Sequence, residues 1–406
     1  MSPAGATTAT WRSTPLEAEA PNPRRRTRVE ELERQIERLL PRLRIAVIFG
    51  GDKSAEGAVI NRTINPRPWK SYEKVAHDIA EALRRIGFRE VVTLPDDMQL
   101  GERLRRAGTH LAWLNTGGVQ GFGAMSHAAA MLEMFGVPYL GHDPITTSIL
   151  DTKHLFKREL ALLGLPTAPF VAWHPARGPL EPERNPRFRQ AFGDHPGPFV
   201  VKPVSGRASH HVRVVEDVTG LEEAIADVYA ATDNHVLIET FLPGAEYCIA
   251  VAGSVIARGG RLVRLNAPFT FSAIERRLDG DERIFTSMDQ RPITNDRVRL
   301  LTAETDREVH ARLHELGRAV FEELDLETLI RLDVRADAAG RLYILEANPK
   351  PDLAAPTTEK TSLVCVGLPA ERMSYDDLVL GLLADRLDLL FCRRRGSAHR
   401  LLELLD

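Results

Sequence analysis

Two segments near the C-terminal end of the sequence alternate between apolar and polar residues. They are residues 330–335 and 343–348, and the residues between them, 337–340, favour a turn. Because successive side chains on a strand point to opposite faces, the segments predict a β-hairpin with one apolar face and one polar face. The apolar face would hold Ile330, Leu332, Val334, Tyr343, Leu345 and Ala347, and the polar face Arg331, Asp333, Glu346 and Asn348. We expect the apolar face to join the core and the polar face to form a site.

The polar face brings two carboxylates together. If the residues next to the turn pair, Arg331 lies opposite Glu346, Asp333 is one diagonal away and Asn348 lies just beyond, at spacings of roughly 5 to 8 Å. Two carboxylates and an amide oxygen suit Mg²⁺, a hard cation that takes oxygen ligands and shares its shell with phosphates. Arg331 would then be free to bind an anion.

The alternative for this hairpin is an amphipathic edge with a surface ion pair, which an isolated pair of charges usually indicates. Pro349 and Pro351 argue against that interpretation, because they end the second strand abruptly at the supposed ligand Asn348.

Strands and helices are predicted to alternate in the first part of the chain. An amphipathic helix at 29–40, whose apolar stripe could pack on the body or on a second subunit, comes first. Predicted strands follow at 45–49, 91–94, 110–114 and 138–141, with helices at 72–86, 101–107 and 127–135. This alternation predicts a parallel sheet with helices on its faces, ending near Leu150. A dinucleotide site is disfavoured, because no G-x-G-x-x-G opens a helix after the first strand.

The remainder of the chain mixes elements of both kinds. We predict helices at 147–163 and 306–324, strands at 199–202, 236–239 and 247–252, an irregular proline-rich segment at 175–198 and a polar loop at 269–286. The fold class is therefore α/β followed by α+β. The expected division is a disordered tail and helix (1–40), an N-terminal α/β domain (41–150), a central subdomain (151–240) and a C-terminal subdomain (241–406).

Composition narrows the function classes. The chain has 406 residues with 53 basic and 56 acidic side chains, so no overall charge argues for nucleic acid or an anionic membrane as partner. No apolar stretch of about 18 residues is present to span a membrane, and the first 40 residues lack the apolar core of a signal peptide. The 3 cysteines are far apart in sequence, which favours a reducing compartment, with the cytoplasm as the expected location.

With these motifs in view, the chain resembles the ATP-grasp superfamily and, within it, the D-alanine–D-alanine ligases. Residues 329–333 and 345–348 are similar to the family's magnesium and catalytic-arginine signature, and residues 151–157 and 200–203 to its two nucleotide-binding lysine segments. The resemblance implies two further subdomains that sandwich ATP, with two Mg²⁺ ions, or Mn²⁺ in their place, on Asp333, Glu346 and Asn348. Arg331 would be catalytic.

The resemblance also implies the nucleotide contacts. Lys153 and Lys202 would hold the phosphates under a loop that includes Ser209. Backbone groups of Glu239 and Leu242 would pair with adenine, and Glu246 would accept from the ribose hydroxyls.

Two residues are implied to contact the small amino-acid substrates. Glu56 lies in a stretch similar to the one whose glutamate holds the first substrate's ammonium. The alternative is that this stretch is only a loop in which Ser54 caps a helix. Ser362 would help to seat the acceptor's carboxylate.

The sequence departs from the family at the substrate and phosphate loops. A histidine, His211, stands where the phosphate-covering loop (205–211) has a glycine, residues 116–121 replace the family's G-E-D-G stretch, and no tyrosine is present near 275–277. The function implied is an ATP-dependent carboxylate–amine ligase that joins two amino acids through an acyl phosphate. The alternatives are a specialised amino-acid or peptide ligase of secondary metabolism with substrates other than D-alanine, and a nucleotide-binding regulatory module that lacks turnover.

Overall fold

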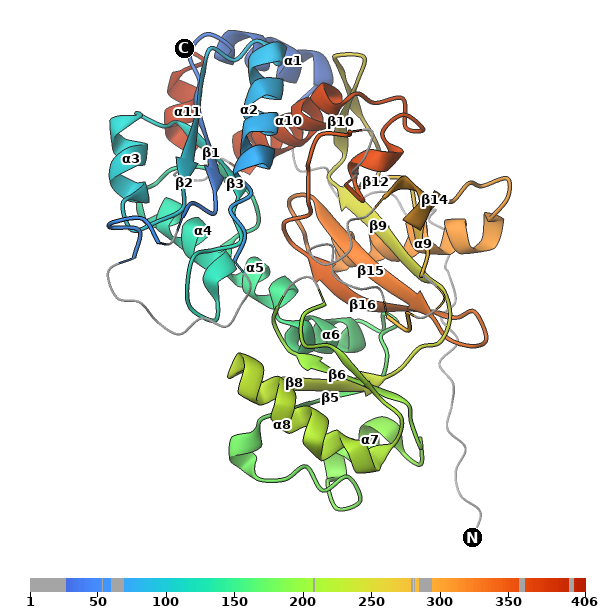
Figure 1. Cartoon of the computed structure of the whole chain (residues 1–406). Coiled ribbons are helices and arrows are strands. Elements are labelled where there is room, and N and C mark those ends of the chain that lie inside the picture. The colour runs from blue at the N-terminus through green and yellow to red at the C-terminus, as the bar shows by residue number, and fades with distance from the viewer. Residues whose placement is uncertain are drawn as a thin grey trace.

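The computed structural model describes most of the chain. The described residues are 27–52, 54–59, 69–206, 209–278, 280, 282–284, 294–357, 362–393 and 398–406. The tail expected to be disordered lies outside them. The N-terminal parallel sheet, the central sheet and the C-terminal antiparallel sheet form three bodies that meet at the middle of the molecule (Figure 1). No helix in these residues is both long and apolar enough to cross a bilayer.

The N-terminal sheet confirms the predicted parallel arrangement. Its strands are β1 (Arg44–Phe49), β2 (Glu90–Pro95), β3 (Leu111–Asn115) and β4 (Tyr139–Leu140), in the order β2-β1-β3-β4. The accompanying helices are α1 (Val29–Leu39), α2 (Glu73–Ile86), α3 (Leu100–Arg106) and α4 (Ala124–Met134). The predicted helix at 29–40 buries Leu32, Ile36 and Leu39 against the body of the same chain.

A helix from the end of the chain completes this first core. The helix α10 (Tyr375–Arg393) returns to contact α2, and its Leu383 and Leu387 belong to the same apolar cluster as Leu83. The short helix α11 (His399–Glu403) buries Leu401 in the same cluster. The helix α1 and the C-terminal helices α10 and α11 thus share one core.

The central part corrects two predictions. The single helix expected at 147–163 is two helices, α5 (Pro144–Asp151) and α6 (Lys153–Leu162), because Thr152 between them is extended. The proline-rich segment contains the helix α7 (Pro186–Phe192). Its prolines misled the prediction: Pro186 occupies the first helical position, where proline is tolerated, and the Asn185 side chain accepts the N–H groups of Arg187 and Phe188.

The central sheet is antiparallel in the order β5-β8-β6-β7. Its strands are β5 (Phe170–Trp173), β6 (Phe199–Pro203), β7 (Arg213–Val215) and β8 (Val236–Thr240), and α8 (Leu221–Thr232) packs on it. The predicted strands at 199–202 and 236–239 are confirmed.

The C-terminal sheet carries the predicted hairpin. Its main path is β14-β13-β9-β15-β16, and β12 pairs with β9. The strands are β9 (Glu246–Ala252), β12 (Phe269–Thr270), β13 (Ile274–Arg276), β14 (Val298–Leu300), β15 (Ile330–Ala336) and β16 (Leu342–Asn348), with α9 (Arg307–Glu323) on one face and a separate ribbon of β10 (Val255–Arg258) and β11 (Arg261–Arg264). The polar loop predicted at 269–286 is therefore wrong where β12 and β13 lie.

A β-bulge changes the register predicted for the hairpin. Asp333 pairs with Glu346, and the next pair along β15 is Val334 with Ile344, so Leu345 is an extra residue. Such a bulge turns the following side chains to the other face. Ile344 is therefore buried in the core, where the alternation had placed Tyr343 and Leu345. The sequence had predicted that Arg331 pairs with Glu346. Because of the bulge, Arg331 pairs with Asn348 instead.

Candidate active site

A cavity lies between the central and C-terminal sheets. Its lining includes eight residues that the sequence had singled out: Lys153, Lys202, Ser209, Glu239, Leu242, Glu246, Asp333 and Glu346. Val200, Leu242, Ile284 and Leu345 supply apolar surface to the same cavity. The combination of an apolar part with several ionic groups suits a ligand with a flat apolar end and a charged end.

The extended residue Thr152 brings one lysine to the cavity. Because α6 begins only after this break, the backbone N–H of Lys153 donates to the carbonyl oxygen of Val204, 2.7 Å away, just beyond β6. The Nζ of Lys153 reaches the Glu346 carboxylate across the cavity at 3.1 Å. The same break thus aligns a lysine of α6 with the end of β16.

A buried carboxylate joins two lysines beneath the cavity. Glu239 of β8 forms ion pairs with Lys202 of β6 and with Lys157 of α6, whose Nζ is 3.1 Å from Oε2, and all three side chains are buried. Burial alone would raise the pKa of Glu239, but the Lys202 and Lys157 ammonium groups outweigh it and lower the pKa to about 2. Lys157 was missed in the sequence, although its position one helical turn after Lys153 was a usable signal.

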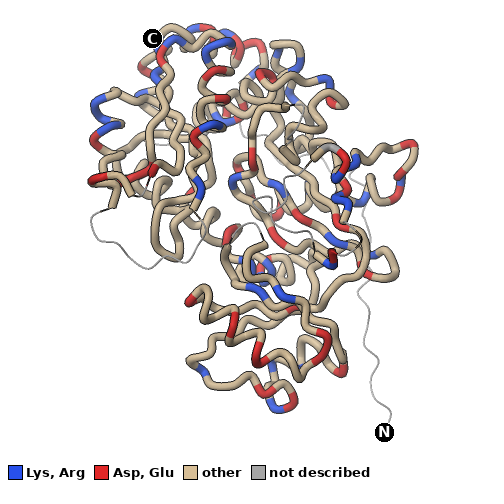
Figure 2. The backbone as a smooth tube through the Cα atoms, viewed as in Figure 1, with Lys and Arg blue, Asp and Glu red and all other residues tan. Residues whose placement is uncertain are grey.

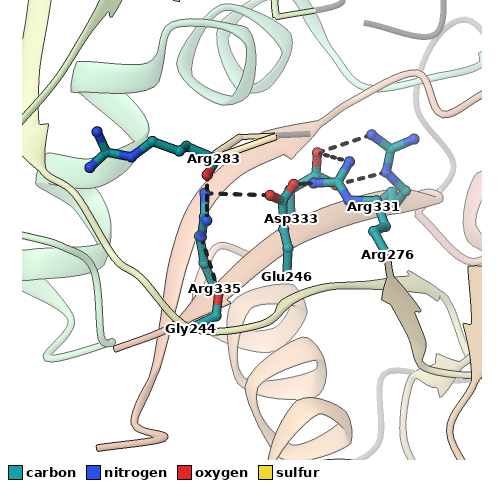
Figure 3. A network of polar contacts seen from close by, with 7 residues as sticks. All are labelled: Gly244, Glu246, Arg276, Arg283, Arg331, Asp333 and Arg335. Carbon is teal, nitrogen blue, oxygen red and sulfur yellow. Dashed lines mark hydrogen bonds and ion pairs between the residues drawn. The ribbon is translucent and has the colours of Figure 1, made fainter. Parts of the chain in front are cut away.

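An arginine that the sequence also missed lies between two predicted ligand residues. Arg276 of β13 donates to Glu246, and its Nη1 is 3.4 Å from Oδ2 of Asp333 (Figure 3). A second arginine, Arg335, has its Nη1 3.6 Å from Oε2 of Glu246. Burial would lower the pKa of Arg276, but the Asp333 and Glu246 carboxylates outweigh it and raise the pKa. Glu246, the expected ribose acceptor, and Asp333, the expected metal ligand, thus share the guanidinium of Arg276.

Arg331 forms an ion pair with Asp333 in this structure. Its Nε donates to Oδ1 of Asp333 at 2.9 Å and its Nη2 to Oδ2 at 3.1 Å (Figure 3). Asp333 and Arg331 lie two positions apart on β15, so both point to the same face. Burial would raise the pKa of Asp333, but the Arg276 and Arg331 guanidinium groups outweigh it and lower the pKa. The carboxylate is therefore held ionised.

The donors on this face fit a hard divalent cation. Asp333 and Glu346 are direct cross-strand partners, and Asn348 follows on the same strand face, so two carboxylates and an amide converge. Across the described part of the chain no three His, Cys, Asp or Glu side chains gather as a metal site, so the set depends on the Asn348 amide oxygen as its third protein ligand. The cations that neutralise these carboxylates here are Lys153, Arg276 and Arg331.

Comparison with known proteins decides the family. The family model described as D-ala D-ala ligase C-terminus matches residues 160–384, which is more than half of the chain. The chain belongs to the D-alanine–D-alanine ligase family.

The chain is also similar to individual proteins over most of its length. The D-alanine–D-alanine ligase of Ectopseudomonas mendocina is 27% identical over 350 residues, which cover 85% of this chain and 95% of the relative. The uncharacterized protein y4sG of Sinorhizobium fredii is 27% identical over 354 residues, which cover 84% of this chain and 96% of that protein.

Solved structures show the ATP-grasp fold. The D-alanine–D-alanine ligase of Bacillus anthracis complexed with ATP superposes with a TM-score of 0.61 at 18% identity, covering 87% of this chain and 99% of that one. VanG D-Ala:D-Ser ligase from Enterococcus faecalis superposes with a TM-score of 0.59 at 15% identity, covering 85% of this chain and 99% of that one. These structures confirm the fold that the sequence predicted, and the family match identifies the protein as an ATP-dependent ligase.

The remaining predicted residues of this ligase lie apart from the cavity lining. Glu56 is exposed in a short turn at 54–59, where Ser54 donates to Asp52. Ser362 is fully buried, and its Oγ donates to the carbonyl oxygen of Asp352. The structure thus gathers the nucleotide residues, Asp333 and Glu346 around one cavity, whereas the lining does not include Arg331, Asn348, Glu56 or Ser362.

The loop predicted to cover the phosphates has an unusual backbone. Ser209 and His211 adopt φ values of 53° and 59°, a left-handed conformation that favours glycine. His210 between them lines the cavity, and His211 is exposed. The histidine at the family's glycine position is accommodated by this strained backbone.

Proposed function

We propose that this ligase transfers the γ-phosphoryl group of ATP to the carboxylate of one amino acid and that the amine of a second attacks the resulting acyl phosphate. The observation that carries the proposal is the cavity in which Lys153 and Lys202 face the cross-strand pair of Asp333 and Glu346. Phosphoryl transfer depends on alignment and charge neutralisation more than on a covalent step by the protein. The two lysines and the two carboxylates of this cavity would supply both the alignment and the charge neutralisation.

Each residue of the cavity has a role in this proposal. Val200, Leu242, Ile284 and Leu345 would enclose the base, Glu246 would accept from the ribose, and Lys153, Lys202 and the loop at Ser209 would hold the phosphates. Asp333, Glu346 and Asn348 would hold two Mg²⁺ ions, or Mn²⁺, which neutralise phosphate charge when bound. Arg276 would compete with the ribose for Glu246 and with a metal ion for Asp333.

The test of the proposed function is a panel of D- and L-amino acids, singly and in pairs, assayed for ADP release with mass spectrometry of the product. We expect ADP release that depends on an amino acid and a product equal to two amino acids minus water. ATP binding without amino-acid-dependent ADP release would favour the non-catalytic module instead.

A specialised ligase with substrates other than D-alanine is the second candidate. Residues 116–121 follow the end of β3 and replace the family's G-E-D-G stretch. This departure from the family favours the specialised ligase. The same panel separates the two, since preference for a pair other than D-alanine with D-alanine would identify the specialised enzyme. A cytoplasmic location and a homodimer stay predictions from the sequence.

Arg331→Lys is expected to lower kcat by about 10²- to 10³-fold with little change in KM for ATP. Arg331 would stabilise the oxyanion that forms when the amine attacks the acyl phosphate. Loss of one such donor costs about 2.7–4 kcal/mol, and lysine keeps the charge but loses the planar fork. Steady-state kinetics with a melting curve checks this, and Arg299→Lys, on β14 with its own carboxylate partners Glu275 and Asp306, is the matched control. If Arg331 only braces Asp333, melting temperature falls while kcat stays near the wild-type value.

A further inference from the structure

The register of the C-terminal sheet places an arginine on each side of Glu246. Arg276 is the direct partner of Glu246 in the pairing of β13 with β9, and Arg335 is its partner in the pairing of β15 with β9. Side chains of directly opposite residues lie close together on one face of a sheet. The contacts of both arginines with Glu246 therefore follow from strand pairing (Figure 3).

Arg276 also reaches a second carboxylate. Its Nη2 donates to Oε1 of Glu246, and its Nη1 is 3.4 Å from Oδ2 of Asp333, which lies on β15 beyond β9. The exposed fraction of the side chain is 9% for Arg276, 6% for Glu246 and 5% for Asp333. Charges that are mostly withdrawn from water act on one another more strongly than surface charges do. The guanidinium thus binds two buried carboxylates at once.

Glu246 holds Arg276 more firmly than Asp333 does. The contact with Asp333 is long for a hydrogen bond, and both oxygens of Asp333 already accept from Arg331, at 2.9 and 3.1 Å. The position of the Arg276 guanidinium therefore depends chiefly on Glu246. A ligand that takes Glu246 would loosen Arg276 from Asp333 as well.

The side chains of Arg276, Glu246 and Asp333 all line the cavity between the central and C-terminal sheets. In the proposed function Glu246 accepts from the ribose and Asp333 is a metal ligand, so two ligands that contact different atoms would displace the same guanidinium. Figure 2 shows acidic and basic residues interspersed over the molecule. Local contacts such as these, and not a broad charge field, therefore govern the binding of a cation in the cavity.

We propose that Arg276 couples nucleoside binding to divalent-metal binding, so that each ligand strengthens the binding of the other. The inference rests on the proposed function and extends it to the energetic link between the two ligands. The first ligand to bind must displace the guanidinium, whereas the second finds its carboxylate already released. Such coupling is reciprocal, because both ligands change each other's affinity by the same factor. The enzyme would therefore load nucleotide and metal together.

The competing explanation is that Arg276 only links β13 to β15 and neutralises their carboxylates. Arg276→Met separates the two roles, because methionine keeps an unbranched apolar side chain but removes the guanidinium. Each carboxylate would retain an arginine in this variant, since Glu246 also pairs with Arg335 and Asp333 with Arg331. We therefore expect Arg276→Met to fold, which a melting curve checks.

The experiment measures the binding of adenosine and Mn²⁺ to the protein, each without and with a saturating amount of the other. Adenosine has no phosphate to bind the metal, so any effect between the two probes passes through the protein. Free Mn²⁺ is measured by electron paramagnetic resonance and adenosine binding by calorimetry. In the wild type we expect adenosine to tighten Mn²⁺ binding by about 10-fold, and Mn²⁺ to tighten adenosine binding by the same factor.

The coupling should disappear in Arg276→Met. We expect this variant to bind each probe alone about 10-fold more tightly than the wild type does, with a coupling factor below about 2. Arg335→Met is the matched control, because it removes a guanidinium from Glu246 but leaves the contacts of Asp333 in place. Its Mn²⁺ affinity should stay within about 2-fold of the wild-type value, with the coupling retained.

A second variant decides the matter if Arg276→Met does not fold. Arg276→Lys keeps a positive charge opposite Glu246, but a single ammonium group lacks the planar fork that spans both carboxylates. We expect its coupling factor to fall below about 3 while the melting temperature stays near that of the wild type.

Three results would overturn the inference. They are a wild type in which adenosine leaves Mn²⁺ binding unchanged or weakens it, wild-type coupling in the folded Arg276 variant, and weaker Mn²⁺ binding in Arg276→Met, which the structural role predicts. In each case amino-acid-dependent ADP release by the wild type would leave the proposed function standing. A wild type that binds neither adenosine nor Mn²⁺ overturns the proposed function as well.

Discussion

Glu346→Gln is expected to lower kcat by about 10³-fold while the protein stays folded. The change keeps the size of the side chain but removes one of the two charges opposed across β15 and β16. A bound metal ion supplies several kcal/mol of charge stabilisation, and each 1.36 kcal/mol is a factor of ten in rate. The Glu346 side chain is 29% exposed and forms an ion pair with Lys153, so we expect little loss of stability. Turnover and Mg²⁺ titration of the variant are the measurements.

A matched control for this prediction lies on the same sheet. Glu275 of β13 is 23% exposed and pairs with Arg299, away from the cavity lining. Glu275→Gln therefore tests the same chemical change outside the site. Comparable loss of turnover in both variants, or wild-type turnover in Glu346→Gln, would contradict the metal assignment.

Glu239→Gln is expected to lower the free energy of unfolding by about 3–5 kcal/mol, because it leaves two buried ammonium groups without their shared carboxylate. Both Lys157 and Lys202 lie within ion-pairing distance of Glu239, and all three side chains are buried. ATP affinity should fall with stability, since Lys202 also lines the cavity. Denaturant unfolding at pH 7 measures the first effect and calorimetry the second.

Glu102→Gln is the control, because Glu102 also pairs with two cations, Arg105 and Arg106, but at an exposed position on α3. Glu102→Gln should lower the free energy of unfolding by less than about 1 kcal/mol. Similar costs for Glu102 and Glu239 would show that the buried triad contributes no more than a surface cluster.

The same triad predicts a pH dependence. The pKa of Glu239 is about 2 in the folded protein, below its ordinary value of 4.5, so its stabilising contribution is complete above pH 4.5 and is lost as pH falls toward 2. Wild type should lose stability through this window more steeply than Glu239→Gln. Unfolding midpoints at pH 5, 4 and 3 test the sign, and parallel curves for the two proteins would contradict it.

The sequence determined which faces carry chemistry. Alternation along 330–335 placed Arg331 and Asp333 on one face, and the pairs of β15 with β16 keep Glu346 and Asn348 with them. This succeeded because the side chains of a strand repeat every two residues, so the face of a residue follows from its own neighbours in sequence. The parallel N-terminal sheet was predictable for a similar reason, since apolar strands and amphipathic helices alternate there.

The tertiary structure decided which charges meet. The bulge at Leu345 set Asp333 opposite Glu346, and Arg276 and Lys157 arrived at Glu246 and Glu239 from other strands and helices. Local periodicity encodes the direction of a side chain but not its partner, because ion pairs and register depend on contacts between segments far apart in the chain. The sequence thus determined the donors of this ligase, and the packing of its sheets decided how each is neutralised.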